Sequence, residues 1–226
     1  MTLAYPFFWV NFKIYPGTAA GDGLAVARTI ERVAADTGVP FVVSPQLPDL
    51  RLLAAETDLP LLAQSADALD PGRGMGRILP GTVAAAGADA LSINHAERRD
   101  TVDDVAGKIE RCRELGLESV VSAHGLEQGR ALATLDPDCI VYEVPGDIAT
   151  DRAITRTHPD RVREFVGTIG EVNPRTKVFL GGGISTGADV ARAFEQGADA
   201  VGAASAVVGA DDPETVLRDL ASGVPE

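Results

Sequence analysis

Short β-rich runs alternate with longer helical segments from one end of this chain to the other. Eight runs are rich in β-branched and aromatic residues, and the segments between them carry apolar residues three to four positions apart, as amphipathic helices do. The 226 residues thus divide into eight strand–helix units. The expected strands are Phe7–Asn11, Pro40–Val43, Leu61–Gln64, Ala90–Ile93, Ser119–Ser122, Cys139–Tyr142, Lys177–Leu180 and Ala200–Val201, and the clearest expected helices are Gly23–Thr37, Val102–Leu115, Pro159–Val172 and Gly187–Gln196.

Strands that alternate with helices favour a parallel sheet. A doubly wound sheet and a closed barrel both fit this periodicity. Eight units, and no G-x-G-x-x-G fingerprint after the first strand, favour the barrel. Glycine-rich turns follow the seventh and eighth expected strands, where barrels commonly bind phosphate. We therefore expect an α/β protein, a single-domain (β/α)₈ TIM barrel over residues 1–226.

Acidic residues outnumber basic ones by 33 to 20, which gives a formal charge of −13. Nucleic acid is therefore a poor partner, because binding to phosphate backbones requires a basic surface. Lysine occurs only at Lys13, Lys108 and Lys177. A lysine-poor, acidic composition is typical of proteins from halophilic organisms, although a GC-rich genome can produce the same bias; we favour the halophilic interpretation.

The sequence also bears on membranes and on the cysteines. No run of 18 apolar residues is present, so we expect no membrane-spanning helix. The first residues lack the pattern of a secretion signal, and we expect a cytoplasmic protein. Cys112 and Cys139 have no metal-ligand or disulfide spacing and are expected to be buried thiols.

Catalytic groups in a barrel lie at the carboxyl ends of the strands. That position selects Lys13 after the first strand, His95 after the fourth and Glu143 after the sixth. Each alone has a plain explanation: a surface lysine, a structural histidine or a salt-bridged glutamate. Together they supply a cation, a neutral acid and a base, which suits proton transfer next to the carbonyl of a small phosphate ester.

Other residues at the same end are expected to support this chemistry. Glu97 is interpreted as a supporting ion-pair partner, with a catalytic role left open, and His124 as an exposed loop histidine. No His/Cys/Asp cluster or dinucleotide fingerprint predicts a metal or an organic cofactor. Backbone N–H groups at glycine-rich turns bind phosphate well. The expected substrate-binding residues at these turns and at the end of the first strand, beside Lys13, are Asn11, Gly182, Gly183, Gly202 and Ala203.

Four segments, in order and at the right spacing, resemble the archaeal triosephosphate isomerases: Asn11–Pro16, Ile93–Arg99, Tyr142–Pro145 and Gly181–Ser185. The resemblance implies a glycolytic and gluconeogenic enzyme that interconverts dihydroxyacetone phosphate and D-glyceraldehyde 3-phosphate through an enediolate. It implies Glu143 as the base, His95 and Lys13 as electrophiles, and Ala149 in the lid segment as a further substrate-binding residue that donates its backbone N–H to the phosphate. We also expect a homodimer or homotetramer, because the Gly/Pro-rich loop Asp70–Pro80 carries apolar Met75 and Ile78.

The sequence departs from this family at four places. Ala96 replaces a usual serine, Ser122 a usual cysteine and Met75 a common interface threonine, and the lid segment reads Ala149-Thr150-Asp151 where the family has Gly-Thr-Gly. Two other functions stay open from the residues. One is a different phosphate-binding barrel, such as a sugar-phosphate epimerase or an indole-glycerol-phosphate-type synthase. The other is a non-catalytic barrel that binds phosphorylated metabolites or a protein.

Overall fold

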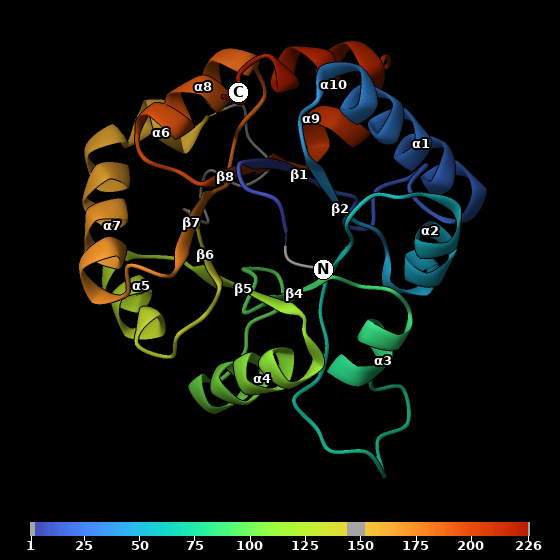
Figure 1. The fold of residues 1–226 in the computed structure, drawn as a ribbon, viewed down its shortest axis with the longest axis vertical. Helices are drawn as coiled ribbons and strands as arrows, with labels where there is room; N and C mark the ends of the chain where they lie inside the picture. Colours follow the sequence, from blue (N-terminus) through green and yellow to red (C-terminus); the bar gives the residue numbers. More distant parts are fainter. Residues whose placement is uncertain (1–2, 144–151, 226) are drawn as a thin grey trace.

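A closed parallel barrel forms the centre of the protein. The computed structural model describes residues 3–143 and 152–225. Eight parallel strands form one sheet in the order β2-β1-β8-β7-β6-β5-β4-β3. A parallel bridge between Val43 and Leu61 joins the two outer strands, so the sheet closes on itself. Helices surround the strands on all sides (Figure 1). The expected (β/α)₈ barrel is confirmed.

The expected strands all form, with small shifts at their ends. The second strand begins one residue after Pro40, because proline has no N–H to donate to the ladder; the Pro40 carbonyl still accepts from the Phe8 N–H at 2.9 Å. The strands are β1 (Phe7–Asn11), β2 (Phe41–Ser44), β3 (Leu62–Ala63), β4 (Ala90–Ile93), β5 (Glu118–Ala123), β6 (Cys139–Tyr142), β7 (Lys177–Leu180) and β8 (Ala200–Ala203).

The four expected helices form as α1, α4, α7 and α8, and shorter helices complete the outer layer. The helices are α1 (Ala20–Thr37), α2 (Leu50–Glu56) after the 3₁₀ turn η1 (Leu47–Asp49), α3 (Pro80–Ala85), α4 (Val102–Leu115), α5 (Leu126–Ala133), α6 (Ile154–Thr157), α7 (Pro159–Val172), α8 (Gly187–Glu195), α9 (Ser205–Val208) and α10 (Pro213–Ala221).

Alternate residues of each strand face opposite sides of the barrel wall. Phe7 and Trp9 of β1 pack with Phe179 of β7 in the cluster that fills the barrel interior. Phe8 and Val10 belong to the larger cluster between strands and helices. Both free cysteines are buried, Cys139 in the interior cluster and Cys112 in the outer one, as expected.

The amino-terminal segment crosses the end of the barrel where the strands begin. Glu118, the first residue of β5, accepts from the Leu3 N–H at 2.6 Å and from the Tyr5 hydroxyl at 3.1 Å. Leu3 is buried in the interior cluster. These contacts close the end of the barrel opposite to the carboxyl ends of the strands.

One connection extends well beyond the barrel. The chain between β3 and α3 runs outward at the bottom of Figure 1, in teal, before it returns to α3. Its Met75 is fully exposed and Leu69 is half exposed. None of the helices in the described ranges is both long and apolar enough to cross a membrane.

Candidate active site

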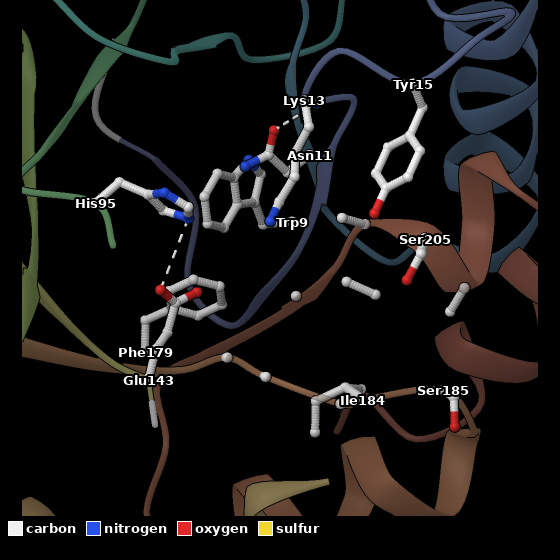
Figure 2. A pocket seen from close by; sticks show the side chains of 17 residues that line it. Trp9, Asn11, Lys13, Tyr15, His95, Glu143, Phe179, Ile184, Ser185 and Ser205 are labelled. Atoms are coloured by element: carbon white, nitrogen blue, oxygen red, sulfur yellow. Dashed lines mark hydrogen bonds and ion pairs between the residues drawn. The ribbon is translucent and has the colours of Figure 1, made fainter. Parts of the chain in front are cut away.

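Lys13, His95 and Glu143 line one pocket at the carboxyl ends of the strands. Figure 2 shows the His95 ring and the Glu143 carboxylate facing each other at one end, with Lys13 above Asn11 on the β1 side. The three residues selected from the strand ends therefore do come together.

Glu143 follows directly after β6 and is buried. Burial raises the pKa of its carboxyl, and this effect outweighs the lowering of the pKa by the nearby His95 and Lys13. Glu143 Oε2 is buried without a hydrogen-bond partner in the described part of the chain. A Cβ on Gly181 would lie 2.9 Å from Glu143 Oε1. Glycine at this position therefore leaves room for a desolvated carboxylate that is available to accept a proton.

His95 is oriented by its own loop. The Glu97 backbone N–H donates to His95 Nδ1 at 3.2 Å, and His95 Nε2 lies 3.7 Å from Glu143 Oε2. Because Nδ1 accepts a hydrogen bond, the proton of the neutral ring lies on Nε2. His95 therefore presents an N–H donor to the pocket.

The loop that carries His95 is held by Asn94, whose φ of 58° lies in the left-handed region. The Asn94 N–H donates to Asp100 Oδ2 at 2.8 Å, and Asn94 Oδ1 accepts from the Asp100 N–H at 3.1 Å. The Asn94 amide also donates to the Ser122 carbonyl at 2.9 Å. The buried Lys108 ammonium pairs with Asp100 at 2.6 Å. Lys108 therefore has a structural role: it pairs with Asp100, which in turn fixes Asn94 and the loop that carries His95.

Lys13 lies on a strained turn after β1, with a φ of 44°. Asn11 Oδ1 accepts from the Lys13 N–H at 2.9 Å, and the Gln64 amide donates to the Lys13 carbonyl at 3.0 Å. The Lys13 ammonium pairs with Glu97 Oε1 at 2.7 Å. Glu97 is thus the ion-pair partner expected from the sequence, and Asn11 positions the Lys13 backbone.

Two turns border the other end of the pocket. The first contains Gly182 and Gly183, whose φ angles of 100° and 69° favour glycine. Gly202 and Ala203 of β8 line the pocket, and in the sheet they pair with Trp9 and Val10 of β1. The second turn begins after β8, at Ala204. Ala149 lies outside the described residues. The pocket-lining residues that were not predicted from the sequence as catalytic or substrate-binding are Trp9, Tyr15, Phe179, Gly181, Ile184, Ser185, Ala204, Ser205 and Ala206.

His124 differs from its interpretation as an exposed loop histidine. It is half-buried after β5, and both ring nitrogens are buried without a hydrogen-bond partner in the described ranges. Burial, together with the nearby Arg99 and His95, lowers the pKa of His124 to about 4. The loop after β4, which carries His95 and Arg99, lies close to this ring.

This environment predicts a pH-dependent stability. The unfolded chain binds a proton at His124 near pH 6.5, and the folded chain only near pH 4, so the free energy of unfolding should fall as the pH drops through that window. The H124N variant should lose about 1–2 kcal/mol less than the wild type between pH 7 and pH 5, allowing for partial solvent screening. Urea melts at the two pH values measure this, and equal losses would contradict it.

The fold and the pocket define a class: a (β/α)₈-barrel protein with a carboxylate, an imidazole and an ammonium at the carboxyl ends of its strands. Comparison with known proteins narrows the class. A profile of the family described as "Triosephosphate isomerase" matches residues 6–221. The chain belongs to the triosephosphate isomerase family and is an isomerase enzyme.

Archaeal relatives named triosephosphate isomerase match nearly the whole chain. The protein of Methanobacterium bryantii is 38% identical over 219 residues, which cover 97% of each chain. That of Methanocaldococcus jannaschii is 35% identical over 211 residues, 93% of this chain and 96% of its own. That of Methanopyrus kandleri is 38% identical over 217 residues, 95% and 96%. The resemblance read from the four sequence segments is confirmed.

Proposed function

We propose that this chain interconverts dihydroxyacetone phosphate and D-glyceraldehyde 3-phosphate, in glycolysis and gluconeogenesis, with Glu143, His95 and Lys13 as its catalytic residues. The observation that carries the assignment of roles is the hydrogen bond from the Glu97 N–H to His95 Nδ1. It directs the Nε2–H of His95 toward the pocket that also holds the desolvated carboxylate of Glu143. The His95 donor and the Glu143 base can therefore act on the same small substrate.

The proposed reaction moves one proton between two neighbouring carbons. Glu143 takes the proton from the carbon beside the carbonyl, while His95 Nε2–H donates to the carbonyl oxygen, and an enediolate forms. Glu143 then returns the proton to the other carbon, while the proton of the neighbouring hydroxyl passes by way of His95 Nε2 to the former carbonyl oxygen, so that the carbonyl and the hydroxyl change places. The Lys13 ammonium stabilises the negative charge of the enediolate and the phosphate. Triosephosphate isomerase is itself the known example of an enzyme that pairs a glutamate base with a neutral histidine.

The phosphate is proposed to bind away from Glu143, among backbone N–H groups of Ala149, Gly182, Gly183, Gly202 and Ala203. Support comes from the positive φ angles of Gly182 and Gly183, which expose backbone groups in the turn after β7. The second turn, after β8, lies on the same pocket. A crystal grown with phosphoglycolate tests the proposal, and an inhibitor bound elsewhere would contradict it.

Turnover itself separates this proposal from its rivals. In a coupled assay, the purified protein should convert glyceraldehyde 3-phosphate to dihydroxyacetone phosphate, which an added NADH-dependent dehydrogenase reports. A phosphate-binding barrel without catalysis would bind the substrate and give no signal. An epimerase or a synthase would give none either. The proposed location is the cytoplasm, where glycolytic substrates occur.

We further propose that the chain forms a homodimer or homotetramer through the loop Asp70–Pro80 and its surroundings. Met75 is fully exposed and Ile14, beside Lys13, is 84% exposed, whereas Ile78 packs partly against the core of its own chain. Ile78 is thus partly buried within its own chain, and Met75 is the residue of this loop that a second copy would bury. Exposed large apolar side chains beside a catalytic loop favour burial against a second copy.

A charge at the loop tip should test this assembly. The M75E variant is expected to sediment as a smaller species than the wild type at micromolar concentration, because an isolated carboxylate resists burial. The A35E variant is a matched control, since Ala35 is exposed on α1, on another side of the barrel from the loop (Figure 1). A wild-type monomer that is fully active would contradict the proposal.

The acidic composition supports a halophilic origin as a further part of the proposal. A formal charge of −13 implies repulsion within and between subunits. The screening length falls from about 10 Å at 0.1 M salt to about 3 Å at 1 M. The melting temperature should therefore rise by several degrees, roughly, between 0.1 and 1 M KCl. A flat or falling series would leave the acidic bias as a compositional accident.

A further inference from the structure

We propose that the Tyr15 hydroxyl binds the phosphate group of the substrate and so contributes to substrate affinity. This inference rests on the proposed function and adds a residue that the sequence reasoning did not select. Tyr15 lines the pocket together with Ser185 and Ser205, which come from the turns after β7 and β8. Three hydroxyl-bearing side chains from three loops thus border the end of the pocket remote from Glu143.

Figure 2 shows the Tyr15 side chain reaching across that end of the pocket, with its hydroxyl close to the turn that carries Ser205. In the described parts of the chain, no protein group forms a hydrogen bond with the Tyr15 hydroxyl. A phenol can donate one hydrogen bond and also accept. Its donor is therefore free for a ligand in the pocket.

The backbone of Tyr15 is fixed by a buried network. The Tyr15 N–H donates to the Phe12 carbonyl at 3.2 Å, and the Tyr15 carbonyl accepts from the Thr18 hydroxyl at 2.6 Å. The Gln46 amide donates to Thr18 Oγ1 at 3.1 Å. Thr18 itself is buried. Such support holds a binding residue in place before the ligand arrives, which lowers the entropy cost of binding.

The position of the reacting groups indicates which part of the substrate lies beside Tyr15. Glu143 and His95 occupy the opposite end, so the carbonyl and its neighbouring carbon lie there, and the phosphate of a triose phosphate must point toward Tyr15. Lys13 lies between the two ends, in Figure 2 on the same side as Tyr15. A neutral hydroxyl donor binds a phosphate oxygen without neutralising it, and hydrogen bonds to charged groups are the stronger kind.

The test compares two tyrosine-to-phenylalanine variants that each delete one hydroxyl. Y15F should raise KM for glyceraldehyde 3-phosphate about 10-fold, the lower end of the range for a hydrogen bond to a charged group, and kcat should change by less than about 3-fold. The inhibition constant of inorganic phosphate should rise by the same factor as KM. Y5F is the matched control, since Tyr5 lies at the opposite end of the barrel; its KM and inhibition constant should stay unchanged.

Three outcomes would overturn the inference. An unchanged KM and inhibition constant in Y15F would show that the hydroxyl does not contact phosphate. A fall in kcat alone would place Tyr15 at the reacting end. Equal effects in Y15F and Y5F would show a general loss of structure. If the wild type binds inorganic phosphate in calorimetry but does not isomerise triose phosphates, the proposed function fails, while weaker calorimetric binding to Y15F still supports the phosphate contact.

Discussion

Replacing Glu143 by glutamine is expected to lower kcat for the isomerisation by about 10²–10⁴-fold, the usual contribution of a positioned general base. The amide keeps the size of the side chain and the room beside Gly181, but it cannot accept the proton from carbon. KM should change little, because the base acts mainly in the transition state. Steady-state kinetics with glyceraldehyde 3-phosphate measures both constants.

A second variant tests whether the exact position of the carboxylate matters, in addition to its presence. E143D keeps the carboxylate but withdraws it by one methylene, and a misplacement of about 1 Å can cost on the order of 10²-fold in rate. The exposed E127Q of α5 is the matched control for a charge change. Full activity in a folded E143Q protein would exclude Glu143 as the base.

The pH profile gives the same residue another test. Burial raises the pKa of Glu143 above the usual range of a glutamate, and the base must be deprotonated to act. Activity should therefore be present at neutral pH and fall as the pH drops through that raised pKa. The acidic limb of kcat/KM should thus have its midpoint above pH 4.5, the ordinary value for a glutamate. E143Q should lose this limb.

Much of the fold could be predicted from the sequence, because each strand–helix unit carries its own local signal. The ranges Phe7–Asn11, Ala90–Ile93, Val102–Leu115 and Pro159–Val172 are the same in sequence and structure. Short helices such as α9 were missed, since four residues are too few for a helical period to show. Barrel closure rests on the Val43–Leu61 bridge, a long-range contact without a local pattern.

The three proposed catalytic residues could be selected from the sequence because strand ends in a barrel share one face. The proposed phosphate-binding turn after β8 was harder to predict from the sequence. The glycine of β8 drew attention to Gly202, yet Gly202 pairs within the sheet with Trp9. A Cβ on Gly202 would meet the Trp9 carbonyl oxygen at 2.7 Å. Strand packing therefore requires a glycine at this position, in addition to the proposed contact with phosphate in the pocket that Gly202 lines, and only the three-dimensional register reveals the packing requirement.

The surroundings of individual side chains were least predictable. His124 was interpreted as exposed, but its ring nitrogens are buried. Ile78 was expected to suit burial better than solvent, and its side chain packs partly against the core of its own chain, a contact that the sequence did not specify. In both cases the sequence placed the residue on the right loop. The exposure of a loop side chain depends on contacts with elements distant in sequence, which no local pattern encodes.

Replacing Lys13 by methionine is expected to lower kcat/KM by about 10²–10³-fold, through both constants. Methionine has nearly the length of lysine without the charge, so the turn held by Asn11 and Gln64 should keep its shape. KM should rise because the substrate phosphate loses its one positively charged neighbour in the described pocket. kcat should fall because the enediolate loses electrostatic stabilisation, and one missing oxyanion partner costs about 10²–10³-fold.

Glu97 provides the control for this variant. The Lys13 ammonium is 13% exposed, while its partner Glu97 is 58% exposed, so solvent screens much of their attraction and the lysine can turn to a phosphate dianion at little cost. E97Q removes the ion pair but keeps the backbone N–H that orients His95. Its effect should therefore stay within about 10-fold, the scale of a partly exposed ion pair. If K13M keeps both kcat and KM of the wild type, Lys13 is a surface charge without a role in catalysis. If E97Q is as damaging as K13M, the lysine acts only through its pairing with Glu97, and its direct contact with substrate is excluded.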